Sequence, residues 1–497
     1  QIFWQTYDSL IAKILIDKFG LTQTWSGLIM ALDNILALFM LPLFGLLSDK
    51  TKTRRGKRTP YILVGTIIAA VSFASLSFMD ANQTKLIEQA NITTEYNIIY
   101  EQIQNKEEID WDSIFDDLNQ QGYHSSYEKY QEVKNDKDIR EQFRNREIAD
   151  VYYDYLSIRA FEVTKANNFV NFVLFIVLLL VVLIAMSSFR SPAVALMPDV
   201  TLKSNRSKAN AVINLMGSAA AVVSILLLTV FGLSKKSYVY YTPAFIGVAV
   251  VMLIALAVFL WKVNEPKMLD EYNLLNKEYE AIHLTEEEQA EVVTKKLTKG
   301  EITSLFLILF SVFFWYMGYN AIISKLSDYA PKQLNMDFAL PLLVAQGAAI
   351  AAFIPIGILS SKIGRKKMIL AGVLLLTISF GTGFFLTENT SSLLYIVLAL
   401  TGIAWATINV NSFPMAVELA TGDDIGKYTG YYYAFSMAAQ IITPILSGLL
   451  MDNFSRSILF PYAAIMVGIS FVTMFFVRHG DVKGSSKGIL ESFDIED

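Results

Sequence analysis

A basic, glycine-containing segment separates two apolar blocks near the start of the chain, and it reads GLLSDKTKTRRGKRTP over residues 45–60. Its first glycine lets two helices approach closely, its aspartate lies at a helix end, and its basic residues can pair with that aspartate. A second copy, GILSSKIGRKK, covers residues 357–367 and also follows an apolar block. Two copies at equivalent places indicate a chain made of two related halves.

The composition around these copies is that of a membrane protein. Of the 497 residues, 54% are hydrophobic and only 18% are charged, and the mean hydropathy is +0.42, whereas soluble domains have about 25% charged residues. The apolar residues fall in blocks of about 20, long enough to cross a ~30 Å hydrocarbon core as helices. We therefore predict an all-α polytopic membrane protein with twelve transmembrane helices in two six-helix bundles. The predicted spans are residues 2–16, 24–47, 60–79, 168–198, 209–233, 240–261, 302–324, 339–360, 368–386, 392–413, 430–451 and 459–477.

These spans divide the chain into regions. The first block is short and the chain begins at Gln1, so we expect the first helix to be truncated at its N-terminus. The predicted regions are an N-terminal bundle over 1–261 with an insert at 80–165, a connection at 262–301, a C-terminal bundle over 302–477 and a tail at 478–497.

Lysine and arginine in short loops set the expected orientation, because they resist translocation. The loops after the second, fourth, eighth and tenth spans hold fourteen of these residues, and the loops on the opposite side hold six. We expect a plasma-membrane protein with both termini and the connection in the cytoplasm.

The insert is then extracellular and strongly acidic. It has 19 acidic and 10 basic residues, a net charge of −9. Apolar positions such as Ile139, Phe143 and Ile148 predict a short helical hairpin. We interpret the insert as a small cap or a flexible loop; the alternative is a module that captures sugar or binds a partner.

Charged residues inside the predicted spans are candidates for ion coupling, because an intramembrane charge costs about 2.5–3.5 kcal/mol and usually faces a cavity or a partner. Asp33 and Asp8 lie roughly 13 Å from the outer ends of neighbouring helices, at 1.5 Å per residue, and Arg190 lies at a similar level. We expect these three residues to meet near the midplane. Asp33 could instead be a structural acceptor beside Asn34, and Arg190 could extend to the inner interface, as we expect Lys13 to do at the outer one.

Uncharged polar and aromatic residues inside the spans suggest a sugar site. Sugars present hydroxyl groups at their edges and C–H groups on their faces, so they need amides, carboxylates and flat aromatic rings. Each such residue could instead join two helices. The candidates are Tyr7, Asn34, Asn214, Tyr316, Asn320, Gln346, Trp405, Asn409 and Gln440.

Composition and motifs exclude several chemistries. The chain has no cysteine and three histidines, all in polar segments, which excludes thiolate metal sites, disulfides and an intramembrane histidine relay. No His-Glu-x-x-His or Gly-x-x-x-x-Gly-Lys element occurs. We expect no enzyme activity, no metal, no cofactor and no nucleic-acid partner; the expected partners are a small molecule and the bilayer, and the expected state is a monomer.

The basic segment resembles a known family. Its Gly-x-x-x-Asp signature is similar to that of the major facilitator superfamily, and DKTKTRRGKRTP over residues 49–60 resembles the glycoside–pentoside–hexuronide:cation symporters and their sucrose-transporter-like branch, solute carrier family 45. A second match, RSPAVALMPD over residues 190–199 followed by RSKANA over 206–211, is similar to the region of the fourth and fifth helices in that branch.

The resemblance implies alternating access, a sugar substrate and gates at the two basic segments. Melibiose-type members hold sodium with two aspartates where this chain has Ala37 and Leu41, so we expect coupling to protons rather than sodium. The second copy has Ser361 and no aspartate, which implies a weaker gate. The gating residues that the resemblance implies are Gly45, Asp49, Arg54, Arg58, Asp199, Gly357 and Arg365.

Three functions remain open from the sequence. The first is a proton-coupled symporter of a sugar or glycoside. The second is an exporter of amphipathic small molecules, which would need a more apolar cavity than Asp33 and Asn34 predict. The third is a transport-inactive membrane sensor, for which neither the connection at 262–301 nor the tail at 478–497 is large enough to be a cytoplasmic output domain.

Overall fold

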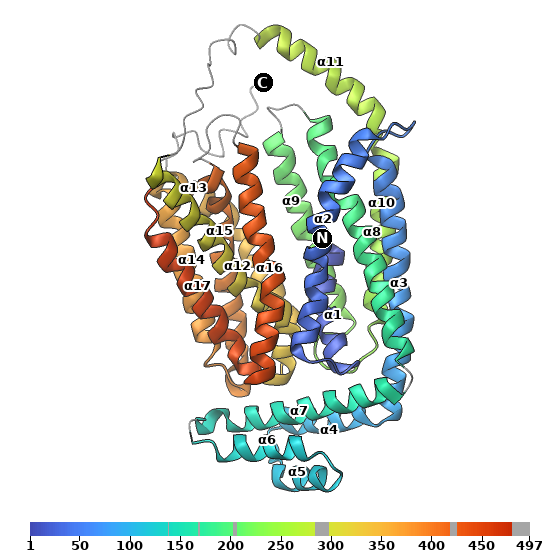
Figure 1. The fold of residues 1–497 in the computed structure, drawn as a ribbon, viewed down its shortest axis with the longest axis vertical. Coiled ribbons are helices and arrows are strands. Elements are labelled where there is room, and N and C mark those ends of the chain that lie inside the picture. Colours follow the sequence, from blue (N-terminus) through green and yellow to red (C-terminus); the bar gives the residue numbers. More distant parts are fainter. Residues whose placement is uncertain (138, 167–168, 202–205, 284–297, 418–424, 480–497) are drawn as a thin grey trace.

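Two groups of membrane helices stand side by side in the computed structural model, and a separate helical unit lies across one end of both (Figure 1). The structure describes residues 1–137, 139–166, 169–201, 206–283, 298–417 and 425–479. Within these ranges all regular elements are helices. Among the described residues, ten helices are long and apolar enough to cross a membrane, and the segment Met216–Val230 of α9 is a shorter apolar helix. The first predicted span forms a helix of 16 residues, α1. The predicted all-α polytopic fold is confirmed.

The first half begins with closely connected helices. Thr22 ends the turn after α1, and its hydroxyl accepts a hydrogen bond of 3.4 Å from the Trp25 amide in the first turn of α2. Pro60 lies in the first turn of α3, where a missing N–H costs nothing. The helices are α1 (Ile2–Asp17), α2 (Gln23–Lys50), α3 (Thr59–Gln89), α8 (Val170–Val200), α9 (Arg206–Val230) and α10 (Thr242–Lys262).

The second half repeats the arrangement. Its first helix starts with a capping box, in which the Glu301 amide donates to the Thr298 hydroxyl and the Glu301 carboxylate accepts from the Thr298 amide. The helices are α12 (Lys299–Gln333), α13 (Ala339–Ile363), α14 (Arg365–Gly383), α15 (Leu394–Val417), α16 (Ile425–Asn453) and α17 (Leu459–Phe475), with 3₁₀ turns η3 (Glu388–Leu393) and η5 (Arg456–Ile458).

Two helices extend well past their predicted spans. We placed the ends of these spans at residues 79 and 324, where charges begin, but α3 continues to Gln89 and α12 to Gln333. The charges beyond the predicted span ends do not stop these helices because they are buried: Asp80 and Asp328 are both 0% exposed. The first separate helix of the insert begins at Ile92.

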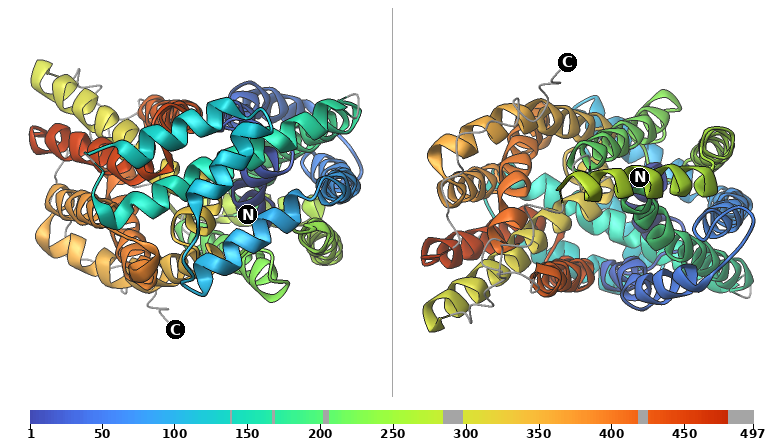
Figure 2. Two further views of the ribbon diagram at one scale, coloured as in Figure 1. Left: turned by 90° about the horizontal axis from the view of Figure 1, so that it is seen from below. Right: turned by 90° about the horizontal axis from the view of Figure 1, so that it is seen from above.

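The insert is larger than the predicted hairpin. It forms four helices, α4 (Ile92–Gln104), α5 (Trp111–Gln120), α6 (His124–Asn135) and α7 (Glu141–Ala166). They bury their own aromatic core, in which the rings of Phe115 and Tyr130 stack with centroids 4.2 Å apart. Seen along the membrane helices, the insert covers the ends of both halves (Figure 2). We call this side of the molecule the insert end.

The opposite side carries the connection between the halves. Helix α11 (Glu265–His283) follows α10 directly and runs across this side (Figure 1), which we call the connection end. Residues 284–297 of the connection and residues 480–497 of the tail lie outside the described residues.

The two halves touch closely at the insert end. A Cβ atom on Gly27 of α2 would lie 1.9 Å from the carbonyl oxygen of Pro444 on α16, and one on Gly448 would lie 2.3 Å from that of Gln23. The backbones of α2 and α16 are thus in direct contact, which only glycine permits. The passage between the halves is closed at this end.

Candidate functional site

A cavity of about 1170 Å³ lies between the two halves. Near its middle it is lined by Asp8 of α1, Asp33 of α2 and Arg190 of α8. Its wall continues toward the connection end, where Ile62 and Phe259 lie within a turn of the ends of α3 and α10. The cavity therefore extends from the middle of the molecule toward the connection end.

The three predicted coupling residues meet in this cavity. Asp8 and Asp33 are close enough for their charges to repel each other, and Arg190 is close enough to attract Asp33. Within the described part of the chain, Asp33 and Arg190 form no direct ion pair; Asp33 accepts a 2.7 Å hydrogen bond from the Asn34 amide. The guanidinium of Arg190 lies over the ring of Trp4, 5.4 Å from its centroid. Asp8, Asp33 and Arg190 thus line the same cavity, and Asp33 and Arg190 do not pair directly with each other.

Polar residues of the second half face these charges. Tyr316 and Asn320 of α12 and Gln440 of α16 line the cavity, as does Asn34. The Nδ2 atom of Asn320 is buried and has no hydrogen-bond partner among the described residues. A buried donor without a partner costs about 1–3 kcal/mol, so this amide can gain from a ligand that accepts its hydrogen bond.

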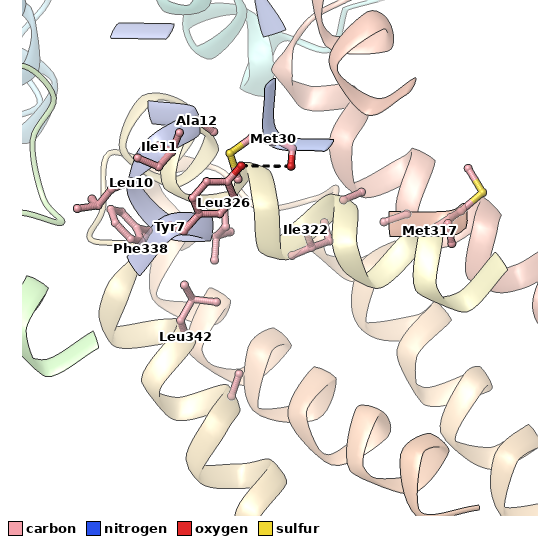
Figure 3. Packing of buried hydrophobic residues seen from close by; sticks show 14 of the residues in the cluster. Tyr7, Leu10, Ile11, Ala12, Met30, Met317, Ile322, Leu326, Phe338 and Leu342 are labelled. Atoms are coloured by element: carbon pink, nitrogen blue, oxygen red, sulfur yellow. Dashed lines mark hydrogen bonds between the residues drawn. The ribbon is translucent and has the colours of Figure 1, made fainter. Parts of the chain in front are cut away.

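Tyr7 lies elsewhere. It is 0% exposed, and its hydroxyl donates to the carbonyl oxygen of Met30 at 3.3 Å. Figure 3 shows its ring packed among Leu10, Leu326 and other apolar side chains between α1 and α12. Tyr7 therefore supports the contact between the halves and does not line the cavity.

Trp405, Gln346 and Asn409 also lie outside the cavity wall. Trp405 stacks on Tyr319 with centroids 3.7 Å apart, and its edge meets the ring of Tyr316 at 5.1 Å. It thus lies behind a residue that lines the cavity. Gln346 and Asn409 are half-buried on α13 and α15 and are not among the lining residues. The side chain of Asn214 lies outside the described residues.

At the connection end, the predicted gating residues gather around Arg58. Its Nη2 pairs with Asp49 at 2.5 Å, and its Nε pairs with Asp199 at 3.0 Å. It also donates to the carbonyl oxygen of Gly45 at 3.4 Å and to the hydroxyl of Ser48. These partners lie on α2 and α8, so Arg58 joins three helices that all belong to the first half.

The other predicted gating residues lie in the loop before α3 and in the second copy of the segment. Arg54 is exposed in the loop. In the second copy, Gly357 is buried within α13 and Arg365 begins α14 after Gly364, whose φ of 103° is in the left-handed region that favours glycine.

Sequence reasoning missed Glu265, which completes the cluster around Arg58. Its carboxylate accepts hydrogen bonds from the backbone amides of Lys57, Arg58 and Thr59, at 2.8–3.1 Å. A carboxylate at the N-terminus of α3 neutralises the positive end of the helix dipole. The sequence feature that could have revealed it is an acidic residue directly after the sixth span. This residue is on the same side of the membrane as the start of α3, whose first backbone amides need acceptors.

Sequence reasoning also missed a buried ionic cluster at the insert end. Lys332 of α12 pairs at 2.6 Å with Asp17 of α1 and at 2.6 Å with Asp328 one turn away. Lys13 is 0% exposed, pairs with Asp17 at 3.4 Å and donates to the carbonyl oxygen of Ser327 at 3.2 Å. The expectation that Lys13 extends to the interface is wrong, because α12 covers it. The i,i+4 spacing of Lys13 with Asp17 and of Asp328 with Lys332 was the available signal.

Comparison with known families agrees with this architecture. Residues 160–354 and 308–493 match the model described as "Major Facilitator Superfamily", and residues 1–87 match the model described as "MFS/sugar transport protein". The multidrug resistance protein MdtM of Escherichia coli K12 is 28% identical over 179 residues, 35% of this chain and 42% of that protein. An uncharacterized MFS-type transporter of Methanocaldococcus jannaschii is 26% identical over 179 residues, 35% of this chain and 44% of that protein. The aligned part spans less than half of the length of these relatives.

Solved structures show the same fold. The inward open conformation of the xylose transporter XylE from E. coli superposes with a TM-score of 0.54 at 12% identity, over 99% of this chain and 96% of that one. The tetrameric transporter PepTSo2 superposes with a TM-score of 0.53 at 13% identity, over 95% and 92%. At 12–13% sequence identity, these similarities indicate a shared fold only. Because the first family model matches more than half of the chain, this multi-pass membrane protein belongs to the major facilitator superfamily.

Proposed function

We propose that the chain is a secondary active transporter that takes up a sugar or glycoside together with protons by alternating access. We place it in the plasma membrane, with the connection end in the cytoplasm and the insert outside, because the loops at the connection end hold fourteen of the short-loop lysines and arginines. In this orientation the structure is closed to the outside and its cavity extends toward the cytoplasm.

One observation carries the proposal. Two carboxylates, Asp8 and Asp33, a guanidinium, Arg190, and amides from both halves line one cavity between the two bundles. Binding near the midplane at the interface of two repeats is the arrangement that alternating access requires.

The carboxylates provide a mechanism for coupling. Asp8 and Asp33 repel each other when both are ionised, so a proton on either one favours any state that holds them close together. A ligand shifts an equilibrium only through its different affinity for the two states. Proton and sugar are therefore coupled if both stabilise the same occluded state.

The polar residues suit a hydroxylated ligand. Asn34, Asn320 and Gln440 can bind hydroxyl groups, and the Tyr316 ring can contact a sugar face with Trp405 packed behind it. The match of residues 1–87 to a sugar transport model also favours a sugar. We assign substrate contact to the cavity-lining members of the predicted set.

The decisive experiment is uptake by proteoliposomes of a panel of labelled mono- and disaccharides, with proton and sodium gradients imposed separately. We expect accumulation of at least one sugar under a proton gradient and none under a sodium gradient alone. Accumulation driven by sodium alone would contradict the proton assignment, and failure of every sugar in both conditions would contradict the substrate class.

The variant Asp33→Asn tests the coupling residue. The amide keeps the shape and the hydrogen bonding but cannot titrate, so accumulation should vanish while exchange of sugar between preloaded vesicles persists. Asp116→Asn on the exposed surface of α5 is the control and should accumulate sugar normally. Arg190→Ala should also impair coupling, and the double variant should lose less than the two single losses combined. If Asp33→Asn still accumulates sugar, Asp8 takes its place.

A second candidate function is export of amphipathic small molecules. The identity to a multidrug resistance protein favours it, as do the apolar residues Met30, Met186 and Phe189 in the cavity wall. Export predicts proton-driven loss of amphipathic dyes from loaded vesicles and no accumulation of sugar, so the same vesicles distinguish the two functions.

A further inference from the structure

The insert is fixed firmly to the first half. Helix α7 passes so close to Gly20 that a Cβ atom there would lie 2.3 Å from the carbonyl oxygen of Ser157. Gln83 of α3 donates a 2.9 Å hydrogen bond to Thr164 of α7. The aromatic core of the insert also includes Tyr238, which precedes α10 in the first half. Together with the direct continuation of α3 into α4, these contacts make the insert move with the first half.

The contacts between the insert and the second half are of a different kind. The Nη1 atom of Arg456 in η5 pairs with Asp150 at 2.5 Å and with Asp154 at 2.8 Å, both on α7. At the far rim, Gln104 of α4 donates a 2.7 Å hydrogen bond to the carbonyl oxygen of Asn335. These contacts are made by charged and polar groups, and Arg456 and Asp150 are buried where the two parts meet.

A third contact lies at the end of α14. Arg146 of α7 donates a 2.9 Å hydrogen bond to the carbonyl oxygen of Leu386, and the ring of Phe143 lies 6.0 Å from that of Phe384. The insert thus spans from the first half to three separate points on the second half, across the end at which the halves meet (Figure 2).

We propose that the insert, residues 92–166, is a latch that holds the carrier closed at the insert end through Arg456, and that α7 must release Arg456 each time this end opens. This inference rests on the alternating access of the proposed function, but not on its sugar or its proton.

The charges around Arg456 allow repeated release. Its Nε also pairs with Asp328 at 2.8 Å within the second half, so the guanidinium keeps a carboxylate when α7 leaves. Asp154 is 44% exposed, and it reaches water with little rearrangement. Asp150 is buried against Arg456 and loses this partner on release, so it must become hydrated as α7 moves away. Arg456 itself is not left as an unpaired buried charge, which is the main cost of breaking a buried ion pair.

The test measures opening directly. The chain has no cysteine, so Lys235→Cys and Asn389→Cys, exposed positions in the first and second halves, can carry two spin labels without background labelling. Distances between the labels are measured by pulsed electron paramagnetic resonance in nanodiscs, without substrate or ion gradient. The measured distances therefore test the latch even if the substrate is not a sugar or the coupling ion is not a proton.

The variant Asp154→Lys places a like charge beside Arg456 at a half-exposed site. We expect the ratio of the long to the short label distance to rise at least tenfold, which corresponds to about 1.4 kcal/mol. Asp116→Lys makes the same charge change on α5, away from the second half, and should leave the ratio unchanged. Equal distance distributions in both variants would overturn the proposal.

A second variant covers the case in which Asp154→Lys does not fold. Gln104 is exposed, so Gln104→Ala removes the rim contact without touching a core, and it should raise the ratio about threefold. If Asp154→Lys does not fold and Gln104→Ala leaves the ratio of long to short label distances unchanged, the latch proposal is equally overturned.

Discussion

The two ends of the molecule use the same pairing of aspartate with a basic residue in opposite ways. At the insert end, Lys332 of the second half holds Asp17 of the first, at 2.6 Å and fully buried. At the connection end, Arg58 holds Asp49 and Asp199, and all three belong to the first half. A pair that crosses between the halves must break when they part, whereas a pair within one half remains. We call a pair between the halves a gate, because it must break for the insert end to open. We call a pair within one half a brace, because it stabilises that half and does not break when the halves part.

The difference explains why the sequence signature and the closed gate are at opposite ends. The motif that resembles the family signature lies around Arg58, whose partners Asp49 and Asp199 belong to its own half. The closed end depends on backbone contact between α2 and α16 and on buried charges. Four predictions test this division, from the largest expected effect to the smallest.

Gly27→Ala should have the largest effect. Its Cβ atom would lie 1.9 Å from the Pro444 carbonyl oxygen, so α2 and α16 cannot meet and the insert end cannot close. We expect uptake to fall below detection and the long distance between labels at Lys235 and Asn389 to dominate. Gly381→Ala, where nothing lies within 4 Å, should transport normally. A Gly27→Ala protein that still closes would show that the helices can shift to make room.

Lys332→Ala should come next, because it removes a cation from between Asp17 and Asp328. Breaking a buried pair in this way costs about 3–5 kcal/mol, and opening relieves that cost by hydrating the carboxylates. The equilibrium should therefore shift toward the state open at the insert end by a hundredfold or more, as measured with the same labels. Lys134→Ala removes an exposed pair with Asp112 and should change little.

Asp49→Asn should have a smaller effect, because Asp49 is 53% exposed and Arg58 keeps Asp199. We expect the transport rate to fall several-fold while membrane insertion and sugar binding stay intact, since a weakened brace alters movement and not the cavity. Binding is measured by calorimetry and transport by initial uptake, with Asp270→Asn on exposed α11 as the control. An equal loss of binding and transport would make Asp49 a structural residue.

Replacement of the insert by a short Gly/Ser linker should have the smallest effect on uptake, provided that the replaced segment leaves the buried contacts of α3 intact. Replacing residues 92–163 keeps Asp80, which pairs with buried Lys18, and Gln83, and uptake should stay within about threefold of the parent. Replacing residues 80–165 removes both and should lower the yield of folded protein. A folded but inactive 92–163 replacement would make the insert a part of the substrate path.

The sequence identified functional candidates most successfully where a charged residue lies inside an apolar span. Asp8, Asp33 and Arg190 were found as charges inside apolar spans, because helical rise alone gives their depth, and the structure places all three in the cavity. The same attention to charge ended the predicted spans at residues 79 and 324, whereas α3 and α12 continue beyond these positions. A charge beyond an apolar block reads as solvent-exposed, and only a partner on another helix reveals that Lys332 or Asp80 is buried.

Polar residues inside the helices were harder to assign. Asn320 and Tyr7 were both predicted as sugar contacts, because each is a polar or aromatic residue inside a predicted span. Asn320 lines the cavity, and Tyr7 is packed between α1 and α12. Their difference depends on the rotation of each helix relative to its neighbours, which a single sequence does not contain.

The sequence by itself determined the membrane class, the two halves, the position of the insert in the chain and the clustering of the Arg58 motif, because each follows from hydropathy, repetition or local charge. Tertiary structure alone decided which end is closed, which polar residues face the cavity, and that the insert contacts both halves. Those features depend on pairs such as Arg456 with Asp150, which are 306 residues apart. Contacts at such separations are fixed by how the helices pack, and local sequence patterns carry no record of them.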